Sequence, residues 1–290
     1  MDVERIPFVV EGSEGEPIRA DLRLAGGPAP RPVVVLCHGF KGFKDWGAWP
    51  DFCSRLAAEG FASIAFNFSH GGLGEHQEKY ERLDLFRRDT WSKQVADLRL
   101  LLAALREGRA PRREALDPER VGLLGHSRGG GVVILVAPEE RGVRAVAGLA
   151  AIAEASRFPA EARERAMREG AYPVLNSRTG EWMPVGREFF EDLETNGERL
   201  SILGAASRLA VPLLLVHGTA DEAVPFEDAG VIAAAAPHGL ATVAPIEGAG
   251  HTFGVRHPYG GPAPDMERAF EATRAFLLRH LSPRCDASSA

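Results

Sequence analysis

Hydrophobic and polar positions follow two patterns along the chain. Short apolar runs rich in β-branched residues predict buried strands. Most of them are separated by amphipathic stretches with a period near 3.6 residues, which predicts helices. The expected strands are IPFVV, IRADLRL, VVVLC, FASIAFNF, RVGLLG, VRAVAGLA, PLLLVHG and ATVAPIEG.

Four helices are expected between or after these strands. The first two strands read as an antiparallel opening joined by a Gly/Glu turn. RGGGVVILVA is expected to be helical despite its β-branched residues, because strands flank it on both sides. Strands that alternate with helices predict an α/β fold with a mostly parallel, doubly wound, eight-stranded sheet. The expected helices are residues 49–59, 91–108, 128–137 and 264–281.

Residues 152–208 interrupt this alternation. The segment is charged and helical around a hairpin-like NSRTGEWMPV, and it is far longer than an ordinary connection. Its aromatic content argues against a disordered linker. We therefore expect an inserted cap after the sixth strand, with residues 1–151 and 209–290 forming the core. The aromatic residues are Phe158, Tyr172, Trp182, Phe189 and Phe190.

Composition excludes several classes of protein. The chain has 290 residues, 45% of them hydrophobic, and a formal net charge of −6, which argues against a broadly basic nucleic-acid-binding face. It shows neither a signal peptide nor an apolar run of the roughly 20 residues that a membrane span requires, so we expect a cytoplasmic protein with no membrane partner. Cys37, Cys53 and Cys285 lack metal-ligand spacing, and the final CDASSA reads as a loose tail.

The pentapeptide Gly125-His126-Ser127-Arg128-Gly129 lies between an expected strand and an expected helix. A nucleophile elbow requires this context, because the serine takes a strained turn and the glycines remove side chains that would collide. Its Oγ would then lie at a helix N-terminus, where negative charge is favoured. The alternative is an ordinary turn serine.

A serine nucleophile needs a base that is oriented by an acid. In an open α/β sheet both should follow later strands at their carboxyl ends. Asp221 follows PLLLVHG and His251 follows ATVAPIEG, in the chain order that hydrolases of this kind use. We therefore predict a Ser127–His251–Asp221 triad. The competing residues are Glu222 as the acid, Glu227 and Asp228 in a following helix, and His257, His280, His38, His217 and His126, the last three of which are expected to brace or pack.

An oxyanion hole needs two backbone N–H groups aimed at one point. Arg128, which follows the nucleophile, should supply one. The other should come from Phe40, in the loop His38-Gly39-Phe40 after VVVLC. The alternative for this loop is a glycine-rich connecting turn.

With HGFKGFKDW, GHSRGG, HGTADEAVP and GAGHTF in this order, the chain resembles an α/β-hydrolase. More closely, it resembles the dienelactone-hydrolase-like and cinnamoyl (feruloyl) esterase-like branch. That resemblance implies an α/β-hydrolase fold with a helical cap and hairpin between the sixth and seventh strands. Dienelactone hydrolases proper usually carry a cysteine nucleophile, whereas this elbow has Ser127.

These residues predict a serine hydrolase that cleaves carboxylic esters of small or aromatic acyl groups through an acyl-enzyme. Trp182 and Met183, near the hairpin turn, are expected to reach over the serine and bind substrate; alternatively, Trp182 packs the cap onto the core. We expect a small-molecule ester substrate, no cofactor, no metal and no nucleic acid, and a homodimer is left open. The alternatives are an acylaminoacyl-peptidase-like peptidase, a thioesterase, or a ligand-binding protein on an inactive hydrolase fold.

Overall fold

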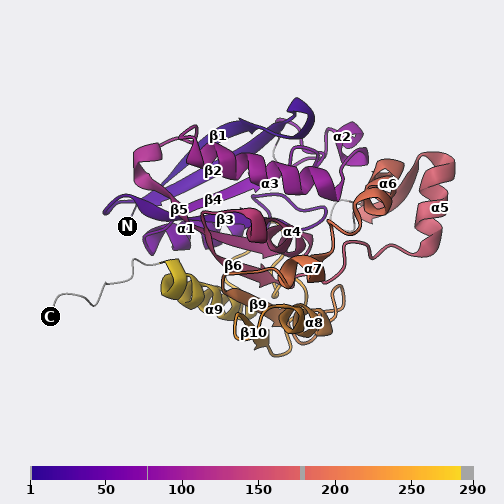
Figure 1. The fold of residues 1–290 in the computed structure, drawn as a ribbon. Coiled ribbons are helices and arrows are strands. Elements are labelled where there is room, and N and C mark those ends of the chain that lie inside the picture. Colours follow the sequence, from indigo (N-terminus) through magenta and orange to yellow (C-terminus); the bar gives the residue numbers. More distant parts are fainter. Residues whose placement is uncertain (1, 77, 177–179, 282–290) are drawn as a thin grey trace.

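A single eight-stranded sheet runs through the protein (Figure 1). The computed structural model describes residues 2–76, 78–176 and 180–281, so Cys285 and the CDASSA tail lie outside the described residues. The strand order is β1-β2-β4-β3-β5-β6-β9-β10, and a separate two-stranded sheet pairs β7 with β8. The strands are β1 (Val3–Glu11), β2 (Pro17–Ala25), β3 (Arg31–Cys37), β4 (Ala62–Asn67), β5 (Leu116–His126), β6 (Val143–Leu149), β7 (Ala171–Asn176), β8 (Glu181–Gly186), β9 (Leu213–Gly218) and β10 (Ala241–Ile246).

The direction of the strands confirms the expected sheet. β2 runs antiparallel to both β1 and β4, whereas every pairing from β4 to β10 in the large sheet is parallel. Parallel neighbours place their carboxyl ends at one edge, so the loops after β3, β5, β6, β9 and β10 gather there.

The four expected helices are present as α1, α3, α4 and α9. The sequence did not predict the five-residue helices α2 and α7, and β5 begins at Leu116 rather than at Arg120. Both helices are too short for a 3.6-residue period to be recognised. The helices are α1 (Trp49–Ala58), α2 (Leu83–Arg87), α3 (Trp91–Arg106), α4 (Arg128–Val136), α5 (Ala160–Glu169), α6 (Arg187–Asn196), α7 (Ile202–Ala206), α8 (Glu227–Ala235) and α9 (Pro264–Leu281).

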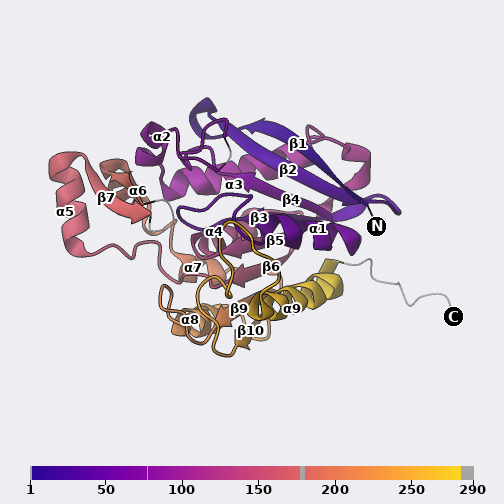
Figure 2. The same cartoon turned by 180° about the vertical axis from the view of Figure 1, so that it is seen from behind.

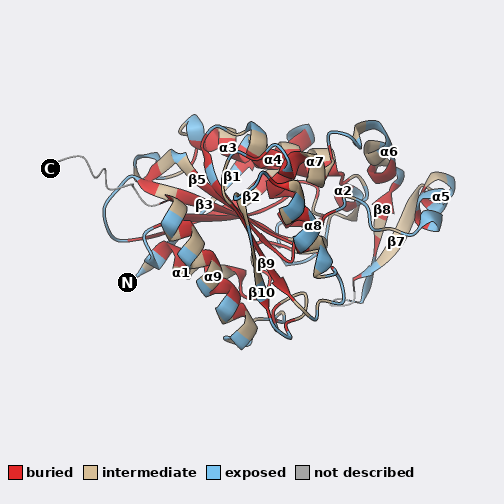
Figure 3. Cartoon of the chain, turned by 60° about the horizontal axis from the view of Figure 1, so that its bottom comes forward, coloured by how far each residue is buried: buried red, intermediate tan, exposed pale blue. Residues whose placement is uncertain are grey.

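Two apolar layers cover the two faces of the sheet. Because side chains alternate along a strand, Val33 and Val35 of β3 join the cluster under α3 and α4, while Val34 and Leu36 join the cluster under α1 and α9. Figure 3 shows α1 and α9 on one side of the sheet and α3 and α4 on the other, with buried residues turned inward. Strands buried on both faces explain the continuous apolar runs of the sequence.

The chain between β6 and β9 forms α5, the β7–β8 hairpin, α6 and α7. Its first four elements lie beyond the end of the sheet (Figures 1 and 2). Met183, Phe189 and Phe190 belong to the same apolar cluster as α3 and α4. The expected helices and hairpin are therefore present, although residues 177–179 at the hairpin turn lie outside the described residues. That residues 152–208 form a unit separate from the core stays a prediction.

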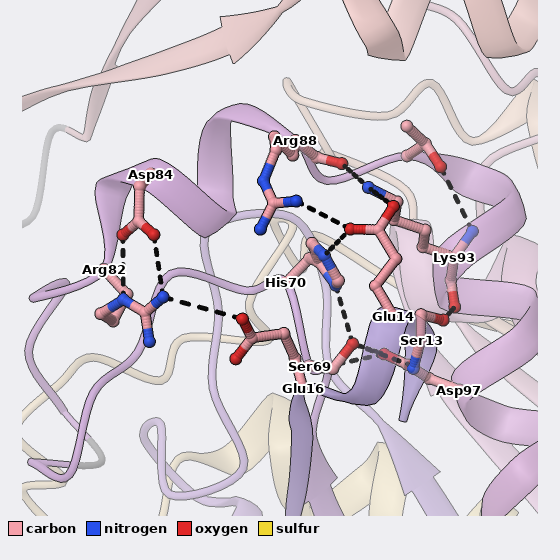
Figure 4. A network of polar contacts seen from close by, with 11 residues as sticks. Ser13, Glu14, Glu16, Ser69, His70, Arg82, Asp84, Arg88, Lys93 and Asp97 are labelled. Atoms are coloured by element: carbon pink, nitrogen blue, oxygen red, sulfur yellow. Dashed lines mark hydrogen bonds and ion pairs between the residues drawn. The ribbon is translucent and has the colours of Figure 1, made fainter. Parts of the chain in front are cut away.

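A polar network holds the connection between β1 and β2 against α3 and the carboxyl end of β4 (Figure 4). Asp97 accepts hydrogen bonds from the N–H groups of Ser13 at 2.8 Å and Ser69 at 2.7 Å. Nε2 of His70 lies 3.2 Å from Glu14. The network fixes the chain beside the loop after β3, where Phe68 contacts His38 edge to face at 5.0 Å.

Candidate active site

Ser127 lies on a sharp turn between the last residue of β5 and the first residue of α4. Its φ of 55° and ψ of −119° are unusual for a residue with a side chain. The Ser127 N–H donates to the carbonyl oxygen of Leu149 in β6 at 2.9 Å, which holds the turn against the next strand. Such local strain persists only where the surroundings impose it.

Glycine is required on both sides of this serine. A Cβ atom on Gly125 would lie 2.2 Å from the carbonyl oxygen of Gly129. A Cβ atom on Gly129 would lie 2.3 Å from the carbonyl oxygen of Cys37. The helix that begins at the elbow thus approaches the end of β3 more closely than any side chain would allow.

His251 is paired with a buried carboxylate. Its Nδ1 lies 2.9 Å from Oδ2 of Asp221, whose side chain has 0% exposure. The other oxygen, Oδ1, accepts the N–H groups of Ala223 and Val224, each at 2.9 Å. Burial would raise the pKa of Asp221, but hydrogen bonds from His217, His251 and the Val224 N–H outweigh it and hold that pKa well below its usual range. The carboxylate is therefore ionised, and it fixes the ring of His251.

Two further histidines support this pair. Nε2 of His217 lies 3.0 Å from the Val224 carbonyl oxygen and 3.3 Å from Oδ2 of Asp221, so it must carry a hydrogen that it donates. Nε2 of His126 likewise lies 2.9 Å from the carbonyl oxygen of His251. Both rings therefore brace the loops that carry Asp221 and His251.

Apart from His257, which lines the same pocket as Ser127, the competing residues from the sequence lie elsewhere. Glu222 is exposed, next to Asp221, whose side chain is buried. Asp228 lies in α8, where it accepts the Ala153 N–H at 2.9 Å, and Glu227 precedes it in the same helix. His280 lies in α9, and Nδ1 of His38 is 2.9 Å from the carbonyl oxygen of Gly39.

Ser127 and His251 line one pocket of about 830 Å³ at the carboxyl edge of the sheet. Loops after five strands supply its wall, as expected for an open α/β sheet. The sequence did not identify Asn176 of the hairpin, Phe158 or His257 as lining residues. The pocket is lined by Phe40, Lys41, Trp46, Ser127, Arg128, Ile152, Ala155, Arg157, Phe158, Asn176, Ala223, Val224, His251, Thr252, Val255, Arg256 and His257.

Neither Trp182 nor Met183 is among these lining residues. Trp182 is 63% exposed, and it pairs across the hairpin with Leu175, which is also exposed. Met183 is completely buried, with its sulfur 3.7 Å from the side-chain amide of Asn176. The hairpin therefore reaches the pocket through Asn176, and substrate binding by Trp182 or Met183 stays a prediction.

The two residues predicted to form the oxyanion hole also line the pocket. Arg128 is the first residue of α4, so its N–H has no acceptor within the helix. The loop that carries Phe40 passes close to the serine, because a Cβ atom on Gly39 would lie 3.1 Å from Cβ of Ser127. Both N–H groups thus belong to backbone that adjoins Ser127.

A buried lysine anchors the loop after β3. Lys44 is only 2% exposed, and its Nζ donates to Oδ2 of Asp21 at 2.6 Å. Its N–H donates to the side chain of Asn67 at 2.7 Å. Burial would raise the pKa of Asp21, but the hydrogen bonds and charges of Lys44 and Arg5 lower it overall. These contacts tie the loop to β2 and to the end of β4.

Within residues 2–76, 78–176 and 180–281, no three or more His, Cys, Asp or Glu side chains are grouped so that they could hold a metal ion. No helix in these ranges has both the length and the apolar character needed to cross a bilayer.

The sequence model of the Alpha/beta hydrolase family matches residues 34–265. An uncharacterized 31.7 kDa protein from the traX-finO intergenic region of Escherichia coli is 28% identical over 178 residues. The matched region covers 61% of this chain and 57% of that protein.

Solved structures show the same fold. The esterase domain of a Rhodothermus marinus protein superposes with a TM-score of 0.64 at 22% identity, covering 97% of this chain and 100% of that chain. Est1E from Butyrivibrio proteoclasticus, with ferulic acid bound, superposes with a TM-score of 0.69 at 19% identity, covering 95% of this chain and 100% of that chain.

Proposed function

Since the chain belongs to the alpha/beta hydrolase family, we propose that it is a serine esterase whose triad is Ser127, His251 and Asp221. One observation carries the proposal. A serine on a strained turn at the start of α4 shares a pocket with a histidine that is bonded at 2.9 Å to a buried, ionised aspartate. Fold alone does not assign a reaction, whereas this arrangement supplies a nucleophile, a base and an orienting acid.

The proposed reaction is acyl transfer through Ser127. His251 Nδ1–H donates to Asp221, which leaves Nε2 as the basic nitrogen that takes the proton of Ser127 Oγ. Oγ attacks the ester carbonyl carbon, and the oxyanion that forms accepts the N–H groups of Phe40 and Arg128. His251 then protonates the leaving alcohol, and a water molecule, deprotonated by the same ring, releases the acid from the acyl-enzyme.

The pocket supports small or aromatic acyl groups as substrates. Phe40, Trp46 and Phe158 line it together with Ser127 and His251, and its volume of about 830 Å³ suits a compact ligand. The likeness to Est1E with ferulic acid bound is consistent with an aromatic acyl group. A thioester or an N-acyl peptide would use the same nucleophile and base, so a substrate panel must include both.

The test combines labelling with hydrolysis. A fluorophosphonate probe should label the wild-type protein and not Ser127→Ala, and the variant should hydrolyse p-nitrophenyl acetate several orders of magnitude more slowly at an unchanged melting temperature. Labelling of the variant, or near-equal hydrolysis by both proteins, would refute Ser127 as the nucleophile. Matched aryl, alkyl, hydroxycinnamoyl, thioester and N-acyl peptide substrates then identify the preferred class, and a higher kcat/KM for the thioester or the peptide would overturn the esterase assignment.

A further inference from the structure

The two residues predicted to supply the oxyanion hole also contact each other through their side chains. The guanidinium carbon of Arg128 lies 4.0 Å from the centre of the Phe40 ring. We propose that this contact sets the position of the Phe40 N–H relative to the Arg128 N–H, so that both side chains are positioning residues. The proposal rests on the serine-esterase function, and it assigns to these side chains a role that is separate from their backbone N–H groups.

The guanidinium group is held in place from several sides. It lies 3.6 Å from Oδ2 of Asp89, and it faces the rings of Phe189 at 5.1 Å and Trp91 at 5.4 Å. Arg128 is 6% exposed, and burial lowers its pKa to about 10, which still leaves it charged at neutral pH. A planar cation enclosed in this way has little freedom, so it can act as a fixed support for a ring.

The Phe40 ring is also supported on other sides. Phe86 stacks with it at 5.6 Å, and Phe158 meets it edge to face at 6.2 Å. The ring is therefore enclosed by α2, by the start of the segment after β6 and by Arg128. Because Phe40 has few rotatable bonds between ring and backbone, a fixed ring restricts its N–H.

Such support is needed because the loop is intrinsically permissive. Glycines flank the short stretch at positions 39 and 42, and Lys41 has a φ of 54°. An oxyanion donor contributes only when it lies at hydrogen-bond distance from the developing charge, so small displacements matter. The residue that carries the other donor N–H is Arg128. Its side chain extends from that backbone to the ring of Phe40, the residue that carries the second donor N–H.

Two side-chain substitutions that leave both backbone N–H groups in place test the contact. Arg128→Met and Phe40→Leu should each lower kcat about 10-fold, less than the 10²–10³ of losing a donor outright, with KM within about 2-fold. The affinity for a trifluoromethyl ketone should fall by the same factor as kcat. Ser127 Oγ adds to its carbonyl carbon, the Oγ proton passes to His251, and the ketone oxygen becomes the oxyanion. The kcat of the double variant should be no lower than that of the less active single variant, because each substitution removes the same contact.

A matched control exists on the other face of the sheet. The guanidinium of Arg55 lies 3.7 Å from the ring centre of Phe270, and neither residue lines the pocket. Arg55→Met removes a cation–ring contact by the same substitution and should leave kcat and ketone affinity unchanged. Melting temperatures of all variants separate a loss of folding from a loss of positioning.

Three outcomes would overturn the proposal. Unchanged kcat in Phe40→Leu would show that the ring does not position the donor. Multiplied effects in the double variant would show independent roles. Full activity in Arg128→Lys together with low activity in Arg128→Met would show that the charge acts directly, since lysine keeps the charge but not the planar group. If the wild type itself neither binds the fluorophosphonate nor hydrolyses esters, the esterase function fails instead.

Discussion

Nε2 of His217 lies 3.3 Å from the Asp221 oxygen that also accepts the hydrogen bond of His251. One carboxylate oxygen thus serves two imidazole rings, while the other oxygen is held by two backbone N–H groups. All the hydrogen-bonding capacity of the carboxylate is directed at orientation, which suits an acid that fixes a base and does not itself transfer protons.

Replacement of Asp221 by asparagine should abolish most of the activity. The amide would favour the wrong tautomer of His251, so kcat should fall about 10³- to 10⁴-fold while KM changes little. Steady-state kinetics with p-nitrophenyl acetate measure both quantities. Glu222→Gln is the matched control, since this neighbouring side chain is exposed. Near-normal kcat in Asp221→Asn would assign the acid to another residue.

His217→Phe should have an intermediate effect. The substitution removes the hydrogen bonds to Asp221 and to the Val224 carbonyl oxygen but retains a ring of similar size. The carboxylate would then be less well oriented, and we expect kcat to fall about 10-fold, within the range of a small misplacement of a reacting group. Crystal structures and kinetics of the variant provide the check. A variant with wild-type kcat would limit His217 to packing.

Gly129→Ala should prevent normal folding of the elbow. The added Cβ would lie 2.3 Å from the Cys37 carbonyl oxygen, a contact with backbone that no side chain can relieve. We expect a loss of about 3 kcal/mol or more of unfolding free energy, at the upper end of the cost of overpacking. Gly230→Ala in α8 is the control, because its Cβ would meet nothing within 4 Å. Urea unfolding should show that this control is at least as stable as the wild type.

Asp89 should make stability depend on pH. Burial raises the pKa of Asp89 to about 7, although Arg128 and Gln94 act against the shift. An aspartate in an unfolded chain has a pKa of about 3.9. Between this pH and about 7, the folded state therefore keeps a proton on Asp89 that the unfolded state has lost. The contribution of Asp89 to the unfolding free energy is therefore present at low pH and is lost as pH rises through about 7.

The substitution Asp89→Asn isolates this effect. As the pH rises from about 5 to 8, the stability of the variant relative to the wild type should improve by about 2 to 3 kcal/mol. Urea unfolding of both proteins across this range gives the difference at each pH. A difference that stays constant with pH would show that Asp89 ionises at the same pH in both states.

The sequence predicted those parts of the molecule that depend on local pattern. The apolar run from Val33 to Cys37 predicted a strand covered on both faces, and the two clusters confirm it. The glycines around Ser127 predicted a tight turn, which the backbone angles confirm. Which atoms Gly129 approaches depends on the end of β3, some ninety residues earlier in the chain, and so could not be derived locally.

The hairpin shows where local pattern is insufficient. Alternation along β7 and β8 divides their side chains between two faces but does not say which face meets the pocket. The size and hydrophobicity of Trp182 favoured an inward position, whereas its cross-strand pairing with Leu175 puts both on the exposed face. Packing against the rest of the fold decides this choice, and the polar Asn176 lines the pocket.

β6 and β9 are direct neighbours in the sheet, with Val146 opposite Leu213, although the whole hairpin segment lies between them in the chain. The hydrogen bonds between β6 and β9 therefore form without any contribution from the segment. Insertions, deletions or recombination after Ile152 can alter the pocket wall while Ser127, Asp221 and His251 keep their places, provided that α7 still packs on α4 and α8 and that Phe158 and Phe189 keep their contacts with Phe40 and Arg128. A library that randomises the other positions of this stretch would vary the pocket wall around an unchanged Ser127 and His251.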